Sequence, residues 1–102
     1  MSVILVSPGF GAGWSTWAGS DKKKEIAEYQ PIINFIQEGG NPADLERGGE
    51  DHPLIQQMIK DLDLGSFYTG GASDLELQYV DGPYCIEEYD GSESVRTEAD
   101  FW

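Results

Sequence analysis

The last third of the chain constrains the fold most, because two turn dipeptides separate three short segments of alternating apolar and polar residues. Asp81-Gly82 and Asp90-Gly91 are the pairs that a two-residue type I′ hairpin turn favours. A tight turn at each predicts a three-stranded antiparallel meander over residues 75–97. Its register would place six apolar side chains on one face: Leu75, Leu77, Tyr79, Tyr84, Ile86 and Val95. A slip of one residue would divide this patch between two faces, so we expect this register.

The rest of the chain predicts one more strand and a helical middle. Residues 2–7 hold an apolar run that ends at Pro8-Gly9, which is typical of a buried strand. Apolar residues at helical spacing predict helices over 31–38 and 53–64, with a short helical turn over 41–48. We therefore expect an α+β fold in a single domain, residues 1–102. Its antiparallel sheet would combine the N-terminal strand with the C-terminal meander, and two to three helices would pack on one face.

Charge and cysteine content exclude several classes of protein. The 102 residues include 19 acidic and 6 basic ones, which gives a net charge of −13. Nucleic acids and anionic membranes bind positive surfaces, so direct binding to either is not expected. One Cys and one His cannot supply an intramolecular disulfide or a structural zinc site. No apolar run approaches the length of a membrane span or a signal peptide, so we expect a cytoplasmic protein.

Two segments of the chain resemble a known group of proteins. VSPGFGAGWSTW at residues 6–17 and YCIEEYDGSESV at residues 84–95 are similar to the two ends of small acidic proteins carried by phages and prophages. The resemblance extends to Thr69-Gly70-Gly71, whereas residues 20–65 match only loosely. It implies an accessory protein of a mobile element, made in a bacterial cytoplasm. The family has no settled activity, so the resemblance supplies no catalytic residues.

The predicted meander concentrates acidic side chains. Residues 74–100 contain nine acidic residues and one basic residue, Arg96. The expected register places Glu88 opposite Glu93 and Glu76 opposite Glu87, and like charges in that position destabilise a sheet by some tenths of a kcal/mol each. A row of carboxylates can imitate a nucleic-acid backbone and occupy the basic groove of a DNA- or RNA-binding protein. The predicted partner-binding residues are Glu76, Glu87, Glu88, Asp90 and Glu93. The alternative is a solvated face that only keeps the protein soluble.

The glycine-rich segment after the first strand is a second candidate site. Its backbone N–H groups could hold a phosphate, although the spacing G-x-G-x-G matches neither the dinucleotide fingerprint nor a Walker loop. The predicted ligand-binding residues are Gly9, Gly11, Gly13, Trp14, Ser15, Thr16, Trp17, Thr69 and Gly70. In the alternative, the aromatic rings of this segment cover one end of the core and the glycines permit tight turns.

The sequence offers little support for catalysis. His52 precedes Pro53 at a helix start, where a capping role is the default, and nothing places it near Cys85. The carboxylates of Glu88, Asp90 and Glu93 could suit a divalent cation, but their spacing is not that of an EF-hand. We expect no enzymatic activity, no cofactor and no metal.

These observations predict a non-catalytic binding protein. It would inhibit a bacterial nucleic-acid-handling or defence protein, as anti-CRISPR and anti-restriction inhibitors do, and its partner would be a basic host protein. A binder of nucleotides or other small ligands, using residues 9–17, is one alternative. A structural or assembly protein of the phage particle is another.

Overall fold

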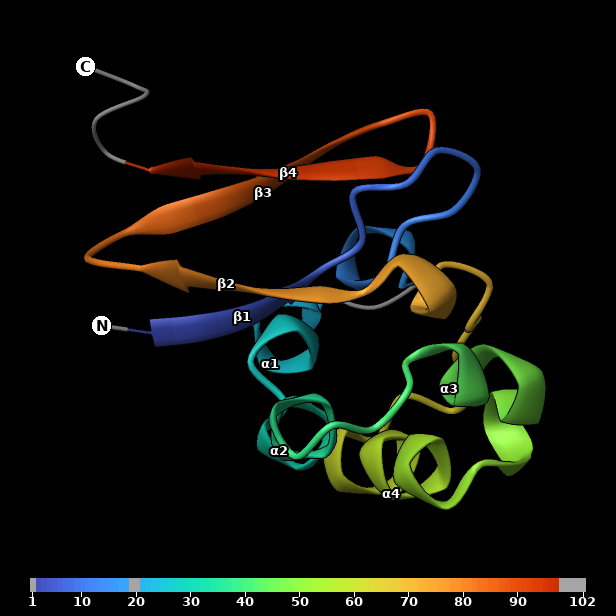
Figure 1. Cartoon of the computed structure of the whole chain (residues 1–102). Coiled ribbons are helices and arrows are strands. Elements are labelled where there is room, and N and C mark those ends of the chain that lie inside the picture. The colour runs from blue at the N-terminus through green and yellow to red at the C-terminus, as the bar shows by residue number, and fades with distance from the viewer. Residues whose placement is uncertain (1, 19–20, 98–102) are drawn as a thin grey trace.

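Helices occupy the middle of the chain and strands lie towards its two ends in the computed structural model, which describes residues 2–18 and 21–97 (Figure 1). The elements in chain order are β1 (Ser2–Val6), the 3₁₀ helix η1 (Ser15–Trp17), α1 (Lys23–Ala27), α2 (Gln30–Gln37), α3 (Ala43–Gly48), the 3₁₀ helix η2 (Gly49–Asp51), α4 (Pro53–Leu62), the 3₁₀ helix η3 (Ala72–Asp74), β2 (Glu76–Val80), β3 (Tyr84–Tyr89) and β4 (Ser92–Thr97). The α+β class is confirmed, and the radius of gyration of 12.8 Å matches the ~13 Å of a compact chain of this length.

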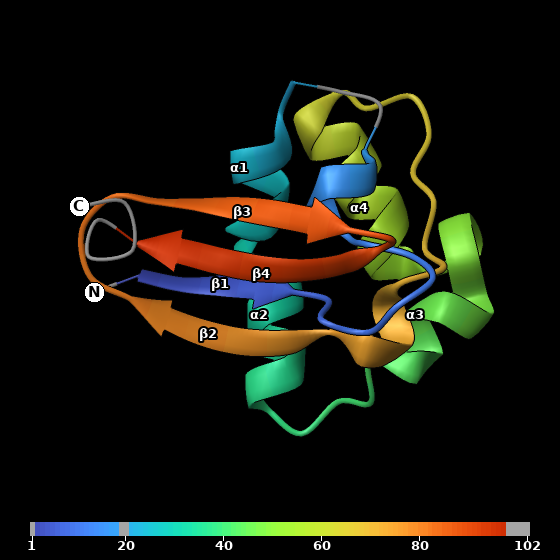
Figure 2. The ribbon, with the colours of Figure 1, turned by 90° about the horizontal axis from the view of Figure 1, so that it is seen from above.

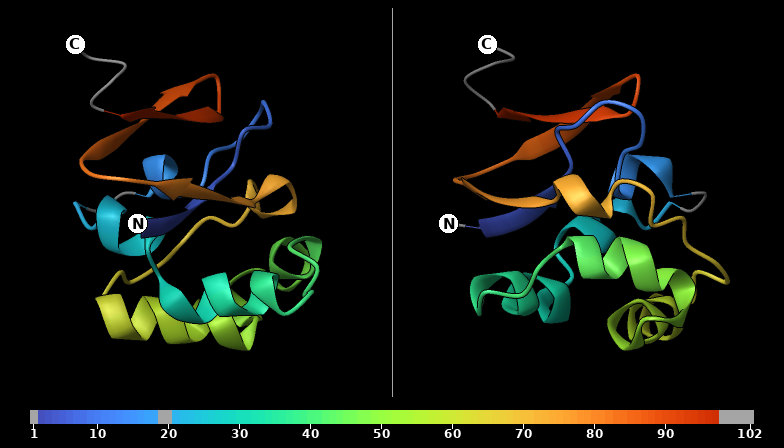
Figure 3. Two further views of the ribbon diagram at one scale, coloured as in Figure 1. Left: turned by 60° about the vertical axis from the view of Figure 1, so that its left-hand side comes forward. Right: turned by 45° about the vertical axis from the view of Figure 1, so that its right-hand side comes forward.

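The elements stack in three layers, with the β1–β2 pair in the middle (Figures 1 and 3). The β3–β4 hairpin covers one face of this pair and the helices cover the other. The run Val3–Val6 is apolar at every position because β1 is covered on both faces. Leu5 belongs to the large core beneath the sheet, whereas Ile4 and Val6 pack against the hairpin.

The predicted three-stranded meander is wrong, because β2 does not pair with β3. β2 instead pairs antiparallel with β1, from Ser2 opposite Val80 to Val6 opposite Glu76. Pro83 explains the difference: it follows Asp81-Gly82 directly and has no N–H to close a two-residue hairpin turn. Leu75 and Leu77 consequently face the helical core rather than the hairpin, and Tyr79 is exposed. The N-terminal strand does pair with a C-terminal strand, but the expected single sheet is replaced by two two-stranded sheets, β1–β2 and β3–β4.

The second predicted hairpin is confirmed residue by residue. β3 pairs with β4 from Tyr84 opposite Thr97 to Tyr89 opposite Ser92, in the predicted register. Asp90 and Gly91 both have positive φ, 51° and 88°, as a type I′ turn requires. The two strand pairs meet where the Glu93 N–H donates to the Ser7 carbonyl at 2.9 Å. Seen from above, the strands follow the order β3, β4, β1, β2 (Figure 2).

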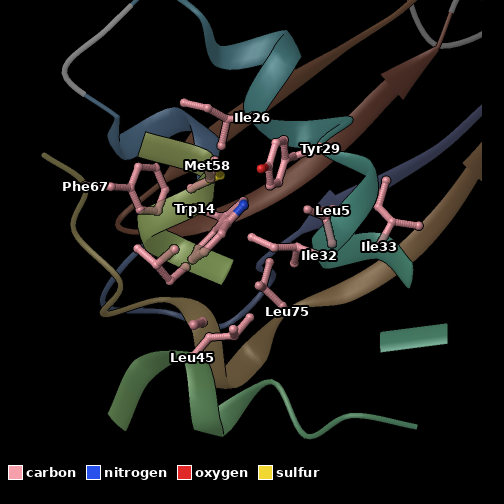
Figure 4. Packing of buried hydrophobic residues seen from close by; sticks show 12 residues of the cluster. Leu5, Trp14, Ile26, Tyr29, Ile32, Ile33, Leu45, Met58, Phe67 and Leu75 are labelled. Carbon is pink, nitrogen blue, oxygen red and sulfur yellow. The ribbon is translucent and has the colours of Figure 1, made fainter. Parts of the chain in front are cut away.

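The main core lies between the β1–β2 pair and the helices, around the fully buried ring of Trp14 (Figure 4). Phe67 packs edge-on against this ring, with centroids 4.6 Å apart. The predicted apolar stripes supply the rest: Ile32 and Ile33 from α2, and Ile55 and Met58 from α4, are all buried. The predicted capping role of His52 is confirmed, since its Nδ1 accepts the Leu54 N–H at 3.1 Å.

Candidate functional site

Glu93 is a completely enclosed glutamate, with a side chain only 1% exposed. Its Oε2 accepts hydrogen bonds from the Trp14 N–H at 2.7 Å, the Thr16 N–H at 3.0 Å and the Thr16 hydroxyl at 2.6 Å. Its Oε1 accepts the Ser7 N–H at 3.0 Å. Four donors thus surround one carboxylate. The prediction that Glu93 belongs to an exposed partner-binding surface is wrong.

The glycine-rich segment supplies three of these four donors. The anion that this segment binds is therefore the carboxylate of Glu93, a side chain of the same chain. Gly13 lets the carboxylate approach, because a Cβ there would lie 2.9 Å from Glu93 Oε2 and 2.7 Å from Thr16 Oγ1. Glu93 therefore occupies the place that sequence analysis assigned to a phosphate. The structure does not support an external ligand in this cradle.

The other predicted ligand contacts also have structural roles. Ser7 Oγ donates to the Gly71 carbonyl at 2.7 Å, which brings the turn at 69–71 directly against the glycine-rich segment. Thr69 is buried there and its carbonyl accepts the Ala72 N–H at 3.0 Å. Gly11 donates its N–H to the Asp90 carbonyl at 2.9 Å, and Gly9 leaves no room for a Cβ beside the Asp74 side chain. Of the predicted set, Ser15 and Thr16 also belong to the lining of a separate cavity of about 690 Å³ between η1, α1 and the beginning of β3.

Glu88 lies opposite Glu93 on the same face of the hairpin and is held in a similar way. Its Oε2 accepts the Trp17 Nε1–H at 3.1 Å and the Gly91 N–H at 2.6 Å. These two hydrogen bonds lower the pKa of the Glu88 carboxyl, the bond from Gly91 more than that from Trp17. The expected repulsion between Glu88 and Glu93 is thus offset by donors within the chain.

The remaining predicted acids lie on the surface but do not form one row. Glu87 pairs with Arg96, with Nε and Oε1 2.5 Å apart, and both side chains are half-exposed. Glu76 is exposed on β2, which pairs with β1, so it is not opposite Glu87 as predicted. Asp90 is exposed at the hairpin turn. Of the predicted acids, Glu87, Glu88 and Asp90 thus lie near the turn of the β3–β4 hairpin, whereas Glu76 and Glu93 do not contribute to its surface.

Exposed aromatic rings gather at the same end of the hairpin. Trp17, bonded to Glu88, stacks on Tyr68 with ring centroids 5.9 Å apart. The Gly11–Asp90 hydrogen bond joins two segments whose neighbouring residues, Phe10 and Tyr89, are 73% and 78% exposed. We call this region the tip surface; it comprises Phe10, Trp17, Tyr68, Glu88, Tyr89 and Asp90.

His52 and Cys85 lie in separate environments. The His52 ring caps α4 and packs edge-on against Phe35, with centroids 6.0 Å apart. Cys85 is exposed on β3, opposite Arg96. Among residues 2–18 and 21–97, no group of three or more His, Cys, Asp or Glu side chains could hold a metal ion. Glu93 points into the glycine-rich segment, so it cannot join Glu88 and Asp90 in binding a divalent cation.

Two tyrosines form hydrogen bonds to carboxylates and resist ionisation. The Tyr29 hydroxyl donates to Asp61 Oδ2 at 2.7 Å, and the Tyr84 hydroxyl donates to Glu28. Burial, followed by the hydrogen bond and charge of the carboxylate, raises the pKa of both phenols. Both stay protonated donors near neutral pH.

The described helices are all too short or too polar to cross a membrane. Comparison with protein-family models, with curated proteins and with solved structures finds no match for this chain.

Proposed function

We propose that the chain is a non-catalytic binding protein, of the phage-borne type, that docks its tip surface on a basic protein of the bacterial host. The partner would handle nucleic acid or act in defence, and the chain would inhibit it by occupying its cationic groove. The observation that carries this proposal is the combination of exposed aromatic rings with fixed carboxylates at one end of the molecule.

The chemistry of the tip surface suits a cationic partner. Phe10, Tyr68 and Tyr89 are 60–78% exposed, and large rings are the side chains that most often anchor protein interfaces. The Glu88 carboxylate lies among them, and Asp90 adds a second charge. Such a surface can meet Arg and Lys side chains by charge pairing and by cation–π contact.

The tip surface is also held in place before any partner arrives. Three hydrogen bonds connect the hairpin turn to the glycine-rich segment: Gly11 N–H to Asp90 O, Ser92 Oγ to Pro8 O at 2.7 Å, and Trp17 Nε1–H to Glu88 Oε2. Binding by a preorganised surface costs less ordering entropy than binding by a mobile loop. The hydrogen bonds to Glu93 also help to hold the tip surface in place, because they fix residues 14–16 to β4.

Capture from bacterial lysate tests the proposal with matched variants. The tagged protein is incubated with nuclease-treated lysate at about 50 mM and about 500 mM NaCl, and the captured proteins are identified by mass spectrometry. Tyr89→Ala removes an aromatic anchor, and Tyr79→Ala is its control because Tyr79 is also largely exposed (63% against 78%), but lies on β2. Glu87→Gln with Asp90→Asn removes two charges near the tip, and Glu38→Gln with Asp51→Asn removes two elsewhere.

We expect wild type and both controls to capture a DNA- or RNA-binding protein at low salt and to release it at high salt. Tyr89→Ala should weaken capture by tenfold or more, about the loss expected for an anchor residue. The captured protein should also lose its own nucleic-acid binding when the chain is added. Capture that resists salt, or that survives equally in Tyr89→Ala and Tyr79→Ala, would contradict the proposal.

A further inference from the structure

Glu88 presents a carboxylate that is exposed and yet fixed in position on the tip surface. Its Oε2 accepts the Gly91 N–H at 2.6 Å and the Trp17 Nε1–H at 3.1 Å, and the side chain remains open to solvent. These two hydrogen bonds, the one from Gly91 more than the one from Trp17, lower the pKa of the carboxyl. Glu88 therefore holds a negative charge at one place on the surface at neutral pH.

The other oxygen of this carboxylate is open to a ligand. Within residues 2–18 and 21–97, no donor bonds to Glu88 Oε1 and no basic side chain pairs with Glu88. The neighbouring Glu87 differs, because Arg96 neutralises it. A carboxylate oxygen can accept more than one hydrogen bond. Oε1 can therefore accept the N–H groups of a cation from outside the chain.

Two stacked aromatic rings adjoin this carboxylate. The ring of Trp17, whose Nε1–H reaches Glu88, stacks on Tyr68 with centroids 5.9 Å apart and planes 22° apart. Trp17 is 41% exposed and Tyr68 is 60% exposed, so both rings keep surface for a further contact. The faces of Trp and Tyr rings attract cations. The carboxylate and the rings thus favour the same class of ligand.

The shape of this site favours arginine over other cations. A guanidinium is planar, so its face can lie on an aromatic ring while its N–H groups reach a carboxylate in the same plane. A lysine ammonium is a compact and strongly hydrated charge that cannot stack. A metal ion does not fit either, because no group of three or more His, Cys, Asp or Glu in the described part of the chain could hold one.

We propose that Glu88, Trp17 and Tyr68 form a recognition site for an arginine side chain of the partner protein. The guanidinium would bond to Glu88 Oε1 and lie against the exposed part of the two stacked rings. The inference rests on the proposed function, because the arginine belongs to the basic partner. It deepens that function by assigning the specificity of the tip surface, which would prefer an arginine to a lysine.

Titrations followed by ¹⁵N–¹H NMR test this site without the partner. The probes are blocked peptides of equal length in which glycine alternates with arginine, with lysine or with citrulline, the neutral planar analogue of arginine. About 150 mM NaCl screens the general attraction between these peptides and an acidic protein. The indole N–H of Trp17 and the backbone N–H of Gly91 report on Glu88 directly, because both donate to it.

Two variants of the site have matched controls elsewhere on the surface. Glu88→Gln removes the charge, and Glu38→Gln removes an exposed charge just after α2. Trp17→Ala removes a ring, and Tyr79→Ala removes an exposed ring on β2. In Trp17→Ala the Gly91 N–H remains as the reporter. The NMR spectrum of each free variant also shows whether it keeps the wild-type fold.

The arginine peptide should give saturable shifts centred on the Trp17 indole, Tyr68 and residues 88–91. The lysine peptide should bind at least about threefold more weakly, and the citrulline peptide should not saturate. Glu88→Gln and Trp17→Ala should each weaken binding of the arginine peptide by about fivefold or more. Each control should change it by less than about twofold.

The arginine site is refuted if the arginine and lysine peptides bind equally, if the shifts centre elsewhere, or if Glu88→Gln binds like wild type. Such a result would leave the proposed function intact if lysate capture still depends on Tyr89 and on salt. Saturable binding of the arginine peptide at Glu88, with no protein captured from lysate, would support the site and contradict the proposed function.

Discussion

The Glu93 carboxylate is a structural group, and replacing one of its oxygens tests that role. In Glu93→Gln the new NH₂ group meets backbone N–H groups that previously had an acceptor. We expect the free energy of unfolding to fall by about 2–4 kcal/mol, since hydrogen bonds to buried charged groups are among the stronger ones. Urea denaturation measures the change.

Glu87→Gln is the matched control for this prediction. It makes the same chemical change on the same hairpin, but at an exposed ion pair with Arg96. Surface ion pairs contribute about 0–1 kcal/mol, so this variant should stay close to wild type. If the two variants are equally stable, the four hydrogen bonds to Glu93 do not contribute as the structure implies.

At the residue scale, the sequence contained evidence that Glu93 is buried, although the high count of acidic residues favoured an exposed position. The predicted register places Glu88 and Glu93 on the same face as Ile86 and Val95, which is the face that turns toward the core. An acid on that face requires donors, and a glycine-rich segment is rich in free N–H groups. The sequence could not predict that Glu93 binds the glycine-rich segment, because the two lie about 80 residues apart in the chain.

At the scale of elements, the β3–β4 turn shows how a backbone contact fixes the tip surface. A Cβ on Gly91 would lie 2.4 Å from the Ala12 nitrogen, and the φ of Gly91 is positive. Gly82 also has positive φ, but nothing lies within 4 Å of a Cβ there. Both substitutions to Ala incur the cost of a left-handed conformation, about 1–2 kcal/mol.

We therefore expect Gly91→Ala to reduce the free energy of unfolding at least twice as much as Gly82→Ala. The additional loss comes from forcing residues 11–12 away from the hairpin turn. Denaturant unfolding of the two variants measures the difference. Equal losses would mean that the glycine-rich segment can move aside without cost, and that the tip surface is not held as described.

The element scale also separates what local sequence can predict from what it cannot. The turn at Asp90-Gly91 and the helical stripes are local patterns, and their hairpin and helices are confirmed. The partner of β2 is a long-range choice between β3 and β1. Pro83 disfavours pairing of β2 with β3. The unbroken apolar run of β1 is typical of a central strand covered on both faces, and it favours pairing of β2 with β1.

At the scale of the whole molecule, two phenol–carboxylate hydrogen bonds connect elements that are distant in the chain. Tyr84 links β3 to Glu28 beside α1, and Tyr29 links the start of α2 to Asp61 in α4. Because folding raises the pKa of both phenols, the unfolded chain loses these protons first as pH rises above about 10. Their contribution to stability is complete below that pH and declines above it.

The double variant Tyr29→Phe with Tyr84→Phe tests this linkage. It should be less stable than wild type at about pH 8, but it should lose less stability between about pH 8 and about pH 11. Urea midpoints at the two pH values give both quantities, and lysine deprotonation affects both proteins alike. A pH-dependent loss as large as that of wild type would show that neither phenol is linked to folding.

The central position of β1 determines when the protein can fold during its synthesis. β1 precedes β2 by about 70 residues and β4 by more, yet it pairs with β2 along one edge and has one face covered by the β3–β4 hairpin. At ~5–20 residues per second, a ribosome takes several seconds to make the intervening chain. Over that interval the run Val3–Val6 has no native strand partner and is open to association with other nascent chains. Native sheet formation therefore waits until the C-terminal hairpin has left the ribosome.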